Sequence, residues 1–417
     1  MRVALMTAGS RGDVAPYTGL AHRLAQAGYG VTLATHGSFA ETARVPGVDF
    51  HPLPVDPRAE LAGERGRALE RSSTGAAKLL RLASMARELT GSMTDGMLEA
   101  ARGSDVLLLS GSLAPVGHAI AEGLRLPSMG VYLQPLAPTR DFAAPVLGTR
   151  SWGAAGNRLS GSALNAVVES IFADAGRTVR SRLGLPRSGP YRARRDRERR
   201  NWPVLHGFSP LVVPRPRDWR SGLTVTGYWW PYDEPEGQLP VRVREFLAAG
   251  PPPVFVGLGS ATVPDPEWIS ALMVAALRRA GLRGVIQGGW SGLRGEGEGL
   301  LTVGELPHTL LFPHMAAVVH HCGAGTTAAG LRAGVPAVPV PVQFDEGFWA
   351  CRLTGLGVAP RALPLRRLTA DALAAALTEV TADPGYQKRA TALAARLAAE
   401  DGPAPVLRAV ERHAARA

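Results

Sequence analysis

Short apolar runs alternate with stretches of helical periodicity along the first half of the chain. The helical stretches cover 16–27 and a segment that follows position 110 and ends near 124. Their apolar residues lie three and four positions apart, as on one face of a helix. The apolar runs that predict strands lie at 2–7, 31–35, 49–53, 106–110 and 128–133. Strands that alternate with helices indicate a parallel, doubly wound α/β sheet.

The second half repeats this pattern. A helix is expected over 266–280, and short apolar strands lie at 254–258, 284–287, 301–303, 317–320 and 337–340. Between the halves lies a stretch rich in proline and acidic residues, which is typical of a linker. We therefore expect two Rossmann-like α/β domains that face each other across a cleft. The predicted parts are a domain over 1–230, a linker over 231–245, a second domain over 246–384, and C-terminal helices over 385–417 that pack back across the joint.

Two segments interrupt the alternation in the first half. Residues 55–100 and 136–205 are long, helix-prone and rich in Arg, Gly and Ser. Insertions of this kind often form a binding face or a lid. Methionines at helical spacing within 84–97 and the side chains of Tyr132, Leu133, Phe142 and Leu147 suit an apolar acceptor molecule, although methionine is equally suited to ordinary core packing.

The chain has a formal net charge of +11, and nearly all of its positive charge is arginine. The densest run covers 192–200. Such a run fits either an anionic partner or a solvated surface segment. Acidic residues interrupt the run and no aromatic residues alternate with its arginines, so we expect a solvated segment and no nucleic-acid partner.

The sequence carries little sign of a membrane span or of export. It has no run of 18 or more apolar residues, and its N-terminus enters a strand pattern directly instead of a signal-peptide pattern. Its two cysteines, Cys322 and Cys351, make neither a disulfide framework nor a zinc site. We expect a cytoplasmic protein that is a monomer or a weak homodimer and is not inserted in a membrane.

The richest chemical signal is His-His-Cys-Gly-Ala-Gly-Thr-Thr at 320–327. It follows an apolar run and precedes a helical pattern of small residues, so it reads as a strand, a glycine-rich turn and a helix start. The backbone N–H groups at a helix start are unpaired and favour an anion. Two hydroxyls and an imidazole at this point suit a phosphate or a diphosphate.

Four motifs in this order resemble those of inverting, nucleotide-sugar-dependent glycosyltransferases of the GT-B fold. They are Gly-Ser-Arg-Gly-Asp-Val-Ala-Pro at 9–16, Val-Thr-Gly-Tyr-Trp at 225–229, Gly-Leu-Gly-Ser at 257–260, and the run at 320–327. The sequence is similar to sterol glucosyltransferases and to bacterial enzymes that glycosylate glycopeptides and polyketides. This resemblance implies transfer of a sugar from UDP- or dTDP-sugar to an acceptor hydroxyl, with the donor in the second domain and a small-molecule acceptor in the first.

The resemblance also assigns donor-binding residues. For the diphosphate it implies His321 and Ser260, together with Gly323, Gly325, Thr326 and Thr327. Leu306 falls where the family holds the nucleobase through backbone groups. Asp345 and Glu346 fall where the family usually has Asp-Gln, which hold the sugar hydroxyls. Because Glu replaces an amide here, we expect a deoxy or otherwise altered sugar instead of glucose.

Inverting transfer needs a base for the acceptor proton and stabilisation of the leaving diphosphate. Asp13 is the candidate base, because it follows the first strand at the end that faces the predicted cleft. Its alternative role is a helix N-cap before Pro16. His320 points to the opposite strand face from His321 and reads as packing or support. Cys322 reads as a small buried residue.

No acidic pair or His/Glu pair with metal-ligand spacing is present, so we expect chemistry without a metal and no cofactor beyond the nucleotide sugar as co-substrate.

Three other functions compete with the transferase. A dinucleotide-dependent oxidoreductase usually has G-x-G-x-x-G after its first strand, which is missing here. A nucleotide-sugar epimerase needs no large acceptor face. A non-catalytic nucleotide-sugar-binding protein does not require Asp13.

Overall fold

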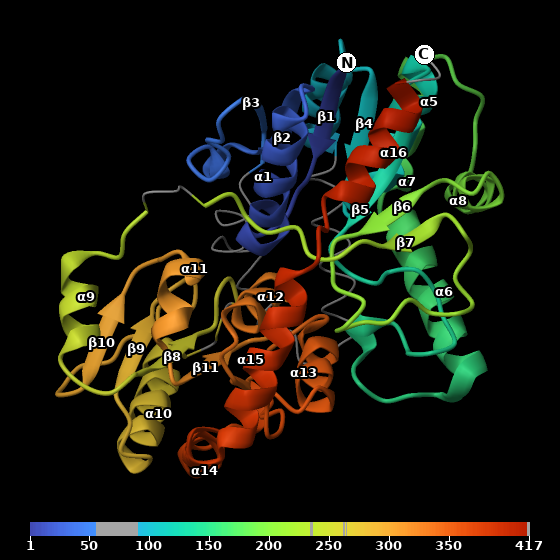
Figure 1. The fold of residues 1–417 in the computed structure, drawn as a ribbon. Coiled ribbons are helices and arrows are strands. Elements are labelled where there is room, and N and C mark those ends of the chain that lie inside the picture. The colour runs from blue at the N-terminus through green and yellow to red at the C-terminus, as the bar shows by residue number, and fades with distance from the viewer. Residues whose placement is uncertain (56–90, 234–236, 262, 264, 415–417) are drawn as a thin grey trace.

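A computed structural model of the chain describes residues 1–55, 91–233, 237–261, 263 and 265–414. It contains two α/β domains, each built on one parallel sheet (Figure 1). The predicted fold class, two Rossmann-like domains of the GT-B type, is confirmed. The predicted segment at 55–100 lies mostly outside the described residues, which include only its end, where residues 91–101 are helical.

The sheet of the first domain has seven parallel strands. In spatial order they are β3 (Val48–Leu53), β2 (Gly30–His36), β1 (Arg2–Met6), β4 (Val106–Leu109), β5 (Ser128–Tyr132), β6 (Val204–His206) and β7 (Leu223–Val225). The sequence patterns predicted the first five of these strands. They missed β6, at the end of the segment 136–205 that was interpreted as an insertion, and β7, just before the stretch that was interpreted as a linker.

The sheet of the second domain has five parallel strands, all of them predicted. In spatial order they are β10 (Leu300–Val303), β9 (Gly284–Gln287), β8 (Val254–Gly257), β11 (Ala317–His320) and β12 (Ala337–Pro339). The register pairs Gly257 at the end of β8 with His320 at the end of β11. The turns that follow these two strands therefore emerge side by side at the carboxyl edge of the sheet.

Helices cover the faces of both sheets (Figure 1). The first domain has α1 (Arg11–Gln26), α5 (Ala114–Leu124), α6 (Gly153–Ile171), α7 (Ala173–Arg182) and α8 (Pro190–Arg199). The second has α9 (Val241–Ala248), α10 (Pro266–Arg279), α11 (His308–Leu311), α12 (Ala324–Ala333), α13 (Glu346–Gly355), α14 (Ala370–Ala382) and α15 (Pro384–Ala398). Short 3-10 turns are η1 (Gly37–Phe39), η2 (Pro145–Leu147), η3 (Phe312–His314) and η4 (Leu365–Arg367).

The helix α1 begins five residues earlier than the predicted helix at 16–27. Ser10 is its N-cap, and Asp13 reaches back to the N-cap backbone as in a capping box. Pro16 therefore lies inside the helix instead of at its start. Pro16 is the sixth residue of the helix, and because it has no N–H it cannot donate to the Gly12 carbonyl four residues earlier. The correction moves Asp13 from a turn into the first turn of a helix.

The last helix, α16 (Ala404–Ala414), leaves the second domain and lies against the first (Figure 1). Its side chains Val406 and Val410 are fully buried in a cluster with Leu5 and Leu20. The segment that leads to α16 is fixed by a hydrogen bond: Nε1 of Trp229 donates to the Gly402 carbonyl oxygen at 3.1 Å. Of the C-terminal helices, α16 returns across the joint as predicted, whereas α15 packs against α12 and α14 of the second domain.

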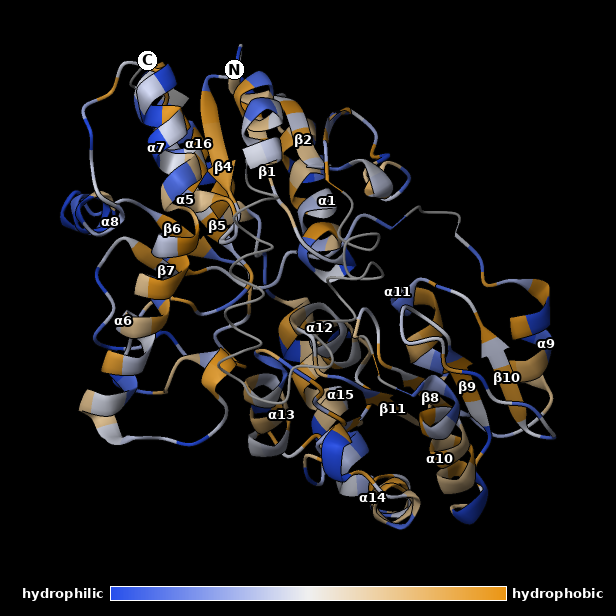
Figure 2. Ribbon diagram, turned by 180° about the vertical axis from the view of Figure 1, so that it is seen from behind, coloured by the Kyte–Doolittle hydropathy of each residue, from blue (hydrophilic) through white to orange (hydrophobic). Residues whose placement is uncertain are grey.

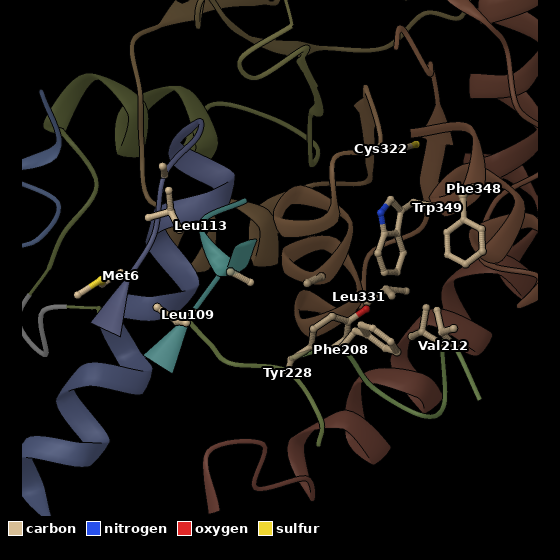
Figure 3. Packing of buried hydrophobic residues seen from close by; sticks show 14 of the residues in the cluster. Met6, Leu109, Leu113, Phe208, Val212, Tyr228, Cys322, Leu331, Phe348 and Trp349 are labelled. Carbon is tan, nitrogen blue, oxygen red and sulfur yellow. The ribbon is translucent and has the colours of Figure 1, made fainter. Parts of the chain in front are cut away.

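An apolar seam joins the two domains (Figure 3). Phe208, from the loop after β6, makes an edge-on contact with Trp349 of α13, and both side chains are fully buried. Val212 and Leu331 belong to the same core cluster. The seam fixes the start of α13, and with it Asp345 and Glu346, relative to the first domain.

The interior of the first sheet is strongly apolar, as the strands β4 and β5 show in Figure 2. Every residue of β4 is buried.

Among the residues that the structure describes, no helix combines the length and the apolar character that crossing a membrane requires.

Candidate donor and acceptor site

The glycine-rich run forms a strand end, a sharp turn and a helix start, as predicted. β11 ends at His320, and α12 begins at Ala324 with Gly323 as its N-cap. Cys322 lies between them with a left-handed backbone, φ +69°. The buried ring of His320 accepts a hydrogen bond from the Cys322 N–H at its Nδ1, at 3.1 Å. His320 therefore supports the turn from inside the domain, and burial keeps Cys322 unreactive by raising the pKa of its thiol.

The ring of His321 lies between two glycine-containing turns. A Cβ atom at Gly259 would lie 2.5 Å from its Cε1, and one at Gly323 would lie 2.5 Å from its Nε2. Real side chains do not approach so closely, so both positions require glycine while the ring is there. Burial lowers the pKa of His321 to about 4, and the imidazole is neutral at physiological pH. A neutral ring acts on a ligand through a hydrogen bond and not as a cation.

The other predicted diphosphate residues gather around the same point. Ser260, half-buried, follows Gly259 in the turn after β8, next to the turn that carries His321. Gly325 and Thr326 are half-buried in the first turn of α12, but Thr327 is fully buried. Its hydroxyl has no hydrogen-bond partner among the described residues. The roles of these residues toward a diphosphate stay predictions.

The starts of α1 and α12 meet across the two domains. A Cβ atom at Gly325 would lie 3.7 Å from the Cα of Gly12, which is ordinary contact distance. Beside this contact, Arg11 pairs with Glu305 at 2.7 Å. Both side chains of that pair are about half exposed, so the pair adds little stability. The contact brings the helix start that carries Asp13 next to the predicted diphosphate turn.

Asp13 is held by residues from two elements. Its Oδ2 accepts hydrogen bonds from the backbone N–H and the hydroxyl of Ser10, at 2.9 and 3.0 Å. Its Oδ1 accepts one from Nε2 of Gln134, after β5, at 3.3 Å. Burial raises the pKa of Asp13, and the three hydrogen bonds oppose that rise. The carboxylate is therefore both the N3 partner of a capping box and a fixed, more basic group than a free aspartate.

The loop before Asp13 is also fixed from a distance. The N–H of Gly9 donates to Nε2 of His36, at the end of β2, at 2.9 Å. Neither His36 nor Gln134 was singled out in the sequence, because each lies far along the chain from its partner and no local pattern marks it. The neighbouring β1 and β2 strands bring His36 to the same sheet edge as Gly9.

Gln134 provides a test of how Asp13 is tuned. Replacing it with leucine removes a hydrogen bond that lowers the pKa of Asp13, so that pKa rises further. We expect the acid limb of the pH profile of kcat/KM to move to higher pH. Gln387→Leu on α15, where Gln387 donates to the Gly334 carbonyl, is the matched control. An unshifted limb in Gln134→Leu would contradict this account.

Asp345 and Glu346 form the start of α13. Oδ2 of Asp345 accepts from Nε1 of Trp349 at 2.7 Å, and its pKa is raised by burial and also by the charge of Asp13. Oε2 of Glu346 accepts the backbone N–H groups of Val342 and Gln343 at 2.6 and 2.7 Å. The buried Glu346 carboxylate thus fixes the loop beside Asp345, a role that the sequence did not indicate.

The residues proposed for the acceptor separate into two groups. Met93 and Met97 are buried in the core cluster, as ordinary packing predicts, whereas Met85 lies outside the described residues. Phe142 is half-buried against the same core cluster and also contacts Phe348 of α13, with ring centroids 5.1 Å apart. Leu306, the predicted nucleobase position, is partly buried against the same core cluster. Among the described residues no group of three or more His, Cys, Asp or Glu could hold a metal.

Buried neutral histidines make stability depend on pH. Burial lowers the pKa to about 3 or 4 in His118, His206, His308, His320 and His321. The unfolded chain takes up these protons near pH 6.5, so stability present at neutral pH is lost as the pH falls from about 6.5 to about 4. Each histidine contributes up to about 1.4 kcal/mol per pH unit.

We expect the melting temperature to fall steadily between pH 7 and pH 5, measured by thermal unfolding. Raised pKa values of Asp13, Glu169 and Asp345 act in the opposite sense and reduce the slope. A melting temperature that is constant or rises over this range would contradict the buried, neutral state of the histidines.

Comparison with known proteins identifies the family. Residues 3–101 match the glycosyltransferase family 28 N-terminal domain, and residues 291–412 match the erythromycin biosynthesis protein CIII-like C-terminal domain. O-mycaminosyltylonolide 6-deoxyallosyltransferase of Streptomyces fradiae is 35% identical over 96% of this chain and 95% of its own length.

A sterol 3-beta-glucosyltransferase of Arabidopsis thaliana is 31% identical over 99% of this chain. The chain spans 66% of the length of that plant relative. The solved structure of the glycosyltransferase SsfS6 from Streptomyces sp. SF2575, complexed with thymidine diphosphate, shares the fold with a TM-score of 0.65. It is 21% identical, and the match covers 99% of each chain. The chain therefore belongs to the GT-B glycosyltransferases that include sterol glucosyltransferases and the glycosyltransferases of macrolide biosynthesis.

Proposed function

We propose that the chain transfers a sugar from a UDP- or dTDP-sugar to a hydroxyl of a hydrophobic small molecule, with inversion at the anomeric carbon. The observation that carries the proposal is the meeting of two helix starts. The one in the first domain presents Asp13, and the one in the second domain follows His321. The candidate base, Asp13, and the candidate anion-binding helix start of α12 then lie in one site. One relative is named for transfer to a sterol and another for transfer to O-mycaminosyltylonolide, and both names support a hydrophobic acceptor.

In this proposal Asp13 takes the proton of the acceptor hydroxyl as its oxygen attacks the anomeric carbon. An alcohol is far less acidic than a carboxylic acid, so proton transfer is late and follows the build-up of positive charge on the hydroxyl oxygen. The raised pKa of Asp13 favours this transfer. The hydrogen bonds from Ser10 and Gln134 hold the carboxylate in one orientation before the acceptor arrives.

The leaving diphosphate is stabilised by the start of α12 and by His321. The ten-residue helix α12 presents the unpaired N–H groups of its first turn, and the positive end of its dipole, at Gly323. Ser260 and Thr326 add hydroxyl donors. The thymidine diphosphate complex of SsfS6 supports a nucleoside diphosphate as the ligand of such a site. No metal is required for charge neutralisation of this kind, and no cofactor other than the nucleotide sugar is proposed.

Acceptor-dependent release of nucleoside diphosphate tests the proposal. The purified chain is incubated with a panel of UDP- and dTDP-sugars, with and without a hydrophobic multi-ring alcohol, and UDP or dTDP is measured. We expect release only with the alcohol, and an unchanged rate with a chelator present. Release of nucleoside diphosphate that does not depend on the alcohol, or conversion of the donor to its epimer, would favour the epimerase instead. Loss of activity with EDTA and its return with magnesium would overturn the metal-independent mechanism.

A further inference from the structure

The positive charge of the chain is concentrated in one segment that the transferase site does not use. Residues 150–200 hold twelve arginines and four carboxylates, so eight of the eleven excess positive charges of the chain lie there. This segment forms α6, α7 and α8. Figures 1 and 2 place α6 and α8 at the outer edge of the first domain, on the side away from β1 and α1.

Specific contacts between α6 and α8 orient both helices. Arg197 of α8 pairs with Glu169 of α6, and both side chains are buried. Arg194 reaches the Ser162 carbonyl at 3.5 Å. These contacts occupy one side of α8, so its opposite side faces outward. That outer face carries Tyr191, Arg192, Arg195 and Arg199, and all four side chains are exposed.

The outward face of α6 is apolar instead of charged. Trp152, just before the helix, is 52% exposed, and Leu159 and Val167 on the helix are 70% and 46% exposed. Ala155 and Ala163 complete a stripe with a spacing of four residues, and both are exposed. Five of the eight large apolar side chains that are exposed among the described residues lie between positions 147 and 191. An apolar stripe on a monomeric domain usually marks an interaction surface.

We infer that the outer faces of α6 and α8 dock the protein on an anionic lipid bilayer. A helix that lies in a membrane interface buries an apolar face with Trp and Leu while basic residues contact the headgroups. The outer face of α8, with its arginines, supplies charge complementary to an anionic surface. A second copy of the chain would bring two strongly positive faces together. Of the five residues of the stripe only Trp152 is aromatic, and the other four are aliphatic and cannot stack on bases, so nucleic acid fits the stripe poorly.

The arginines and the apolar stripe contribute to binding in different ways. Each arginine near an anionic surface contributes about 1 kcal/mol, or about a fivefold change in binding, and salt weakens that contribution. Asp196 lies 4.0 Å from both Arg192 and Arg199 and offsets part of their charge. The apolar side chains contribute in proportion to the area that they bury, independently of salt. Docking is thus reversible and peripheral, without a spanning segment.

Vesicle flotation tests this inference with the full chain. The probes are phosphatidylcholine vesicles with and without about one third phosphatidylglycerol, at low and at physiological salt. We expect binding to the anionic vesicles only, weakened by salt. The triple variant Arg192→Gln/Arg195→Gln/Arg199→Gln should bind about a hundredfold more weakly, at about fivefold per arginine. The pair Leu159→Ser/Val167→Ser should weaken binding at both salt concentrations.

Matched controls lie in the second domain. Arg366→Gln/Arg367→Gln removes exposed arginines, and Trp268→Ser removes an aromatic side chain that is 53% exposed. Both should bind vesicles like the unchanged chain. The α6 and α8 variants should keep their melting temperature and their rate on a water-soluble acceptor, because neither helix carries a residue of the proposed site. Equal binding to neutral vesicles, no binding, or binding that only the control variants weaken would overturn the inference. Self-association or nucleic-acid retention without a preference for anionic vesicles would overturn it as well.

Discussion

Replacing Asp13 with asparagine is expected to lower turnover by about 10²–10⁴-fold, the usual contribution of a positioned general base. The amide keeps the shape of the carboxylate, and its oxygen still accepts the N–H of Ser10, so the start of α1 stays capped. What it loses is the ability to take a proton. Binding of UDP or dTDP, measured by calorimetry, should be unchanged, because the cradle belongs to the second domain.

Asp13→Ala separates the two roles of this side chain. Alanine removes the base and also the capping-box acceptor of the Ser10 N–H, so the start of α1 loses stability. We expect both variants to lose turnover but only Asp13→Ala to melt earlier. Asp265→Asn, at the N-cap of α10, is the control for changing a capping aspartate away from the site. Near-normal turnover in Asp13→Asn would remove Asp13 from the base role and leave it as a structural cap.

The fold followed from the sequence where apolar runs alternated regularly with helical periodicity. Every predicted strand is present, and the second sheet was predicted completely. The two missed strands, β6 and β7, have three residues each and gain their order from pairing with β5 and with each other. Such strands depend on neighbours that are distant in the sequence. The early start of α1 was missed because Pro16 looked like a helix start, whereas the Ser10–Asp13 capping box sets it.

The candidate site divides in the same way. The turn at 320–327 is local, and its strand, turn and helix start could be predicted from residue order alone. The distant groups around Asp13 could not, because Gln134, which binds its carboxylate, follows β5, and His36, which holds Gly9, lies at the end of β2. Glu346 shows a further limit of prediction from the sequence. Its charge indicated an altered sugar, yet one of its oxygens binds two backbone N–H groups of its own loop. A substituted side chain therefore need not face the ligand, and we expect the sugar preference to depend on Asp345 and on the loop that Glu346 fixes.

Adding one methyl group at Gly323 is expected to disable donor binding. The new Cβ would lie 2.5 Å from Nε2 of His321, so the ring must move out of its place between Gly259 and Gly323. Overpacking of this kind costs about 1–3 kcal/mol. The same displacement removes the imidazole from the diphosphate and disturbs the start of α12. We expect binding of UDP or dTDP to weaken by about ten- to a hundredfold, since a hydrogen bond to a charged group is worth about 1.5–3 kcal/mol.

The nearest atoms to a Cβ at Gly323 all belong to the His321 ring, so a double-mutant cycle can test this prediction. In His321→Ala the ring is gone, so Gly323→Ala should add little further loss, and the two effects should not sum. Gly355→Ala, where an added Cβ meets nothing within 4 Å, is the control and should bind like the unchanged chain. If the losses from Gly323→Ala and His321→Ala were additive, the added methyl group would act on the ligand or on the start of α12 directly and not through the imidazole, since alanine keeps the backbone N–H. Non-additive losses would instead mean that Gly323 favours ligand binding by leaving room for the imidazole.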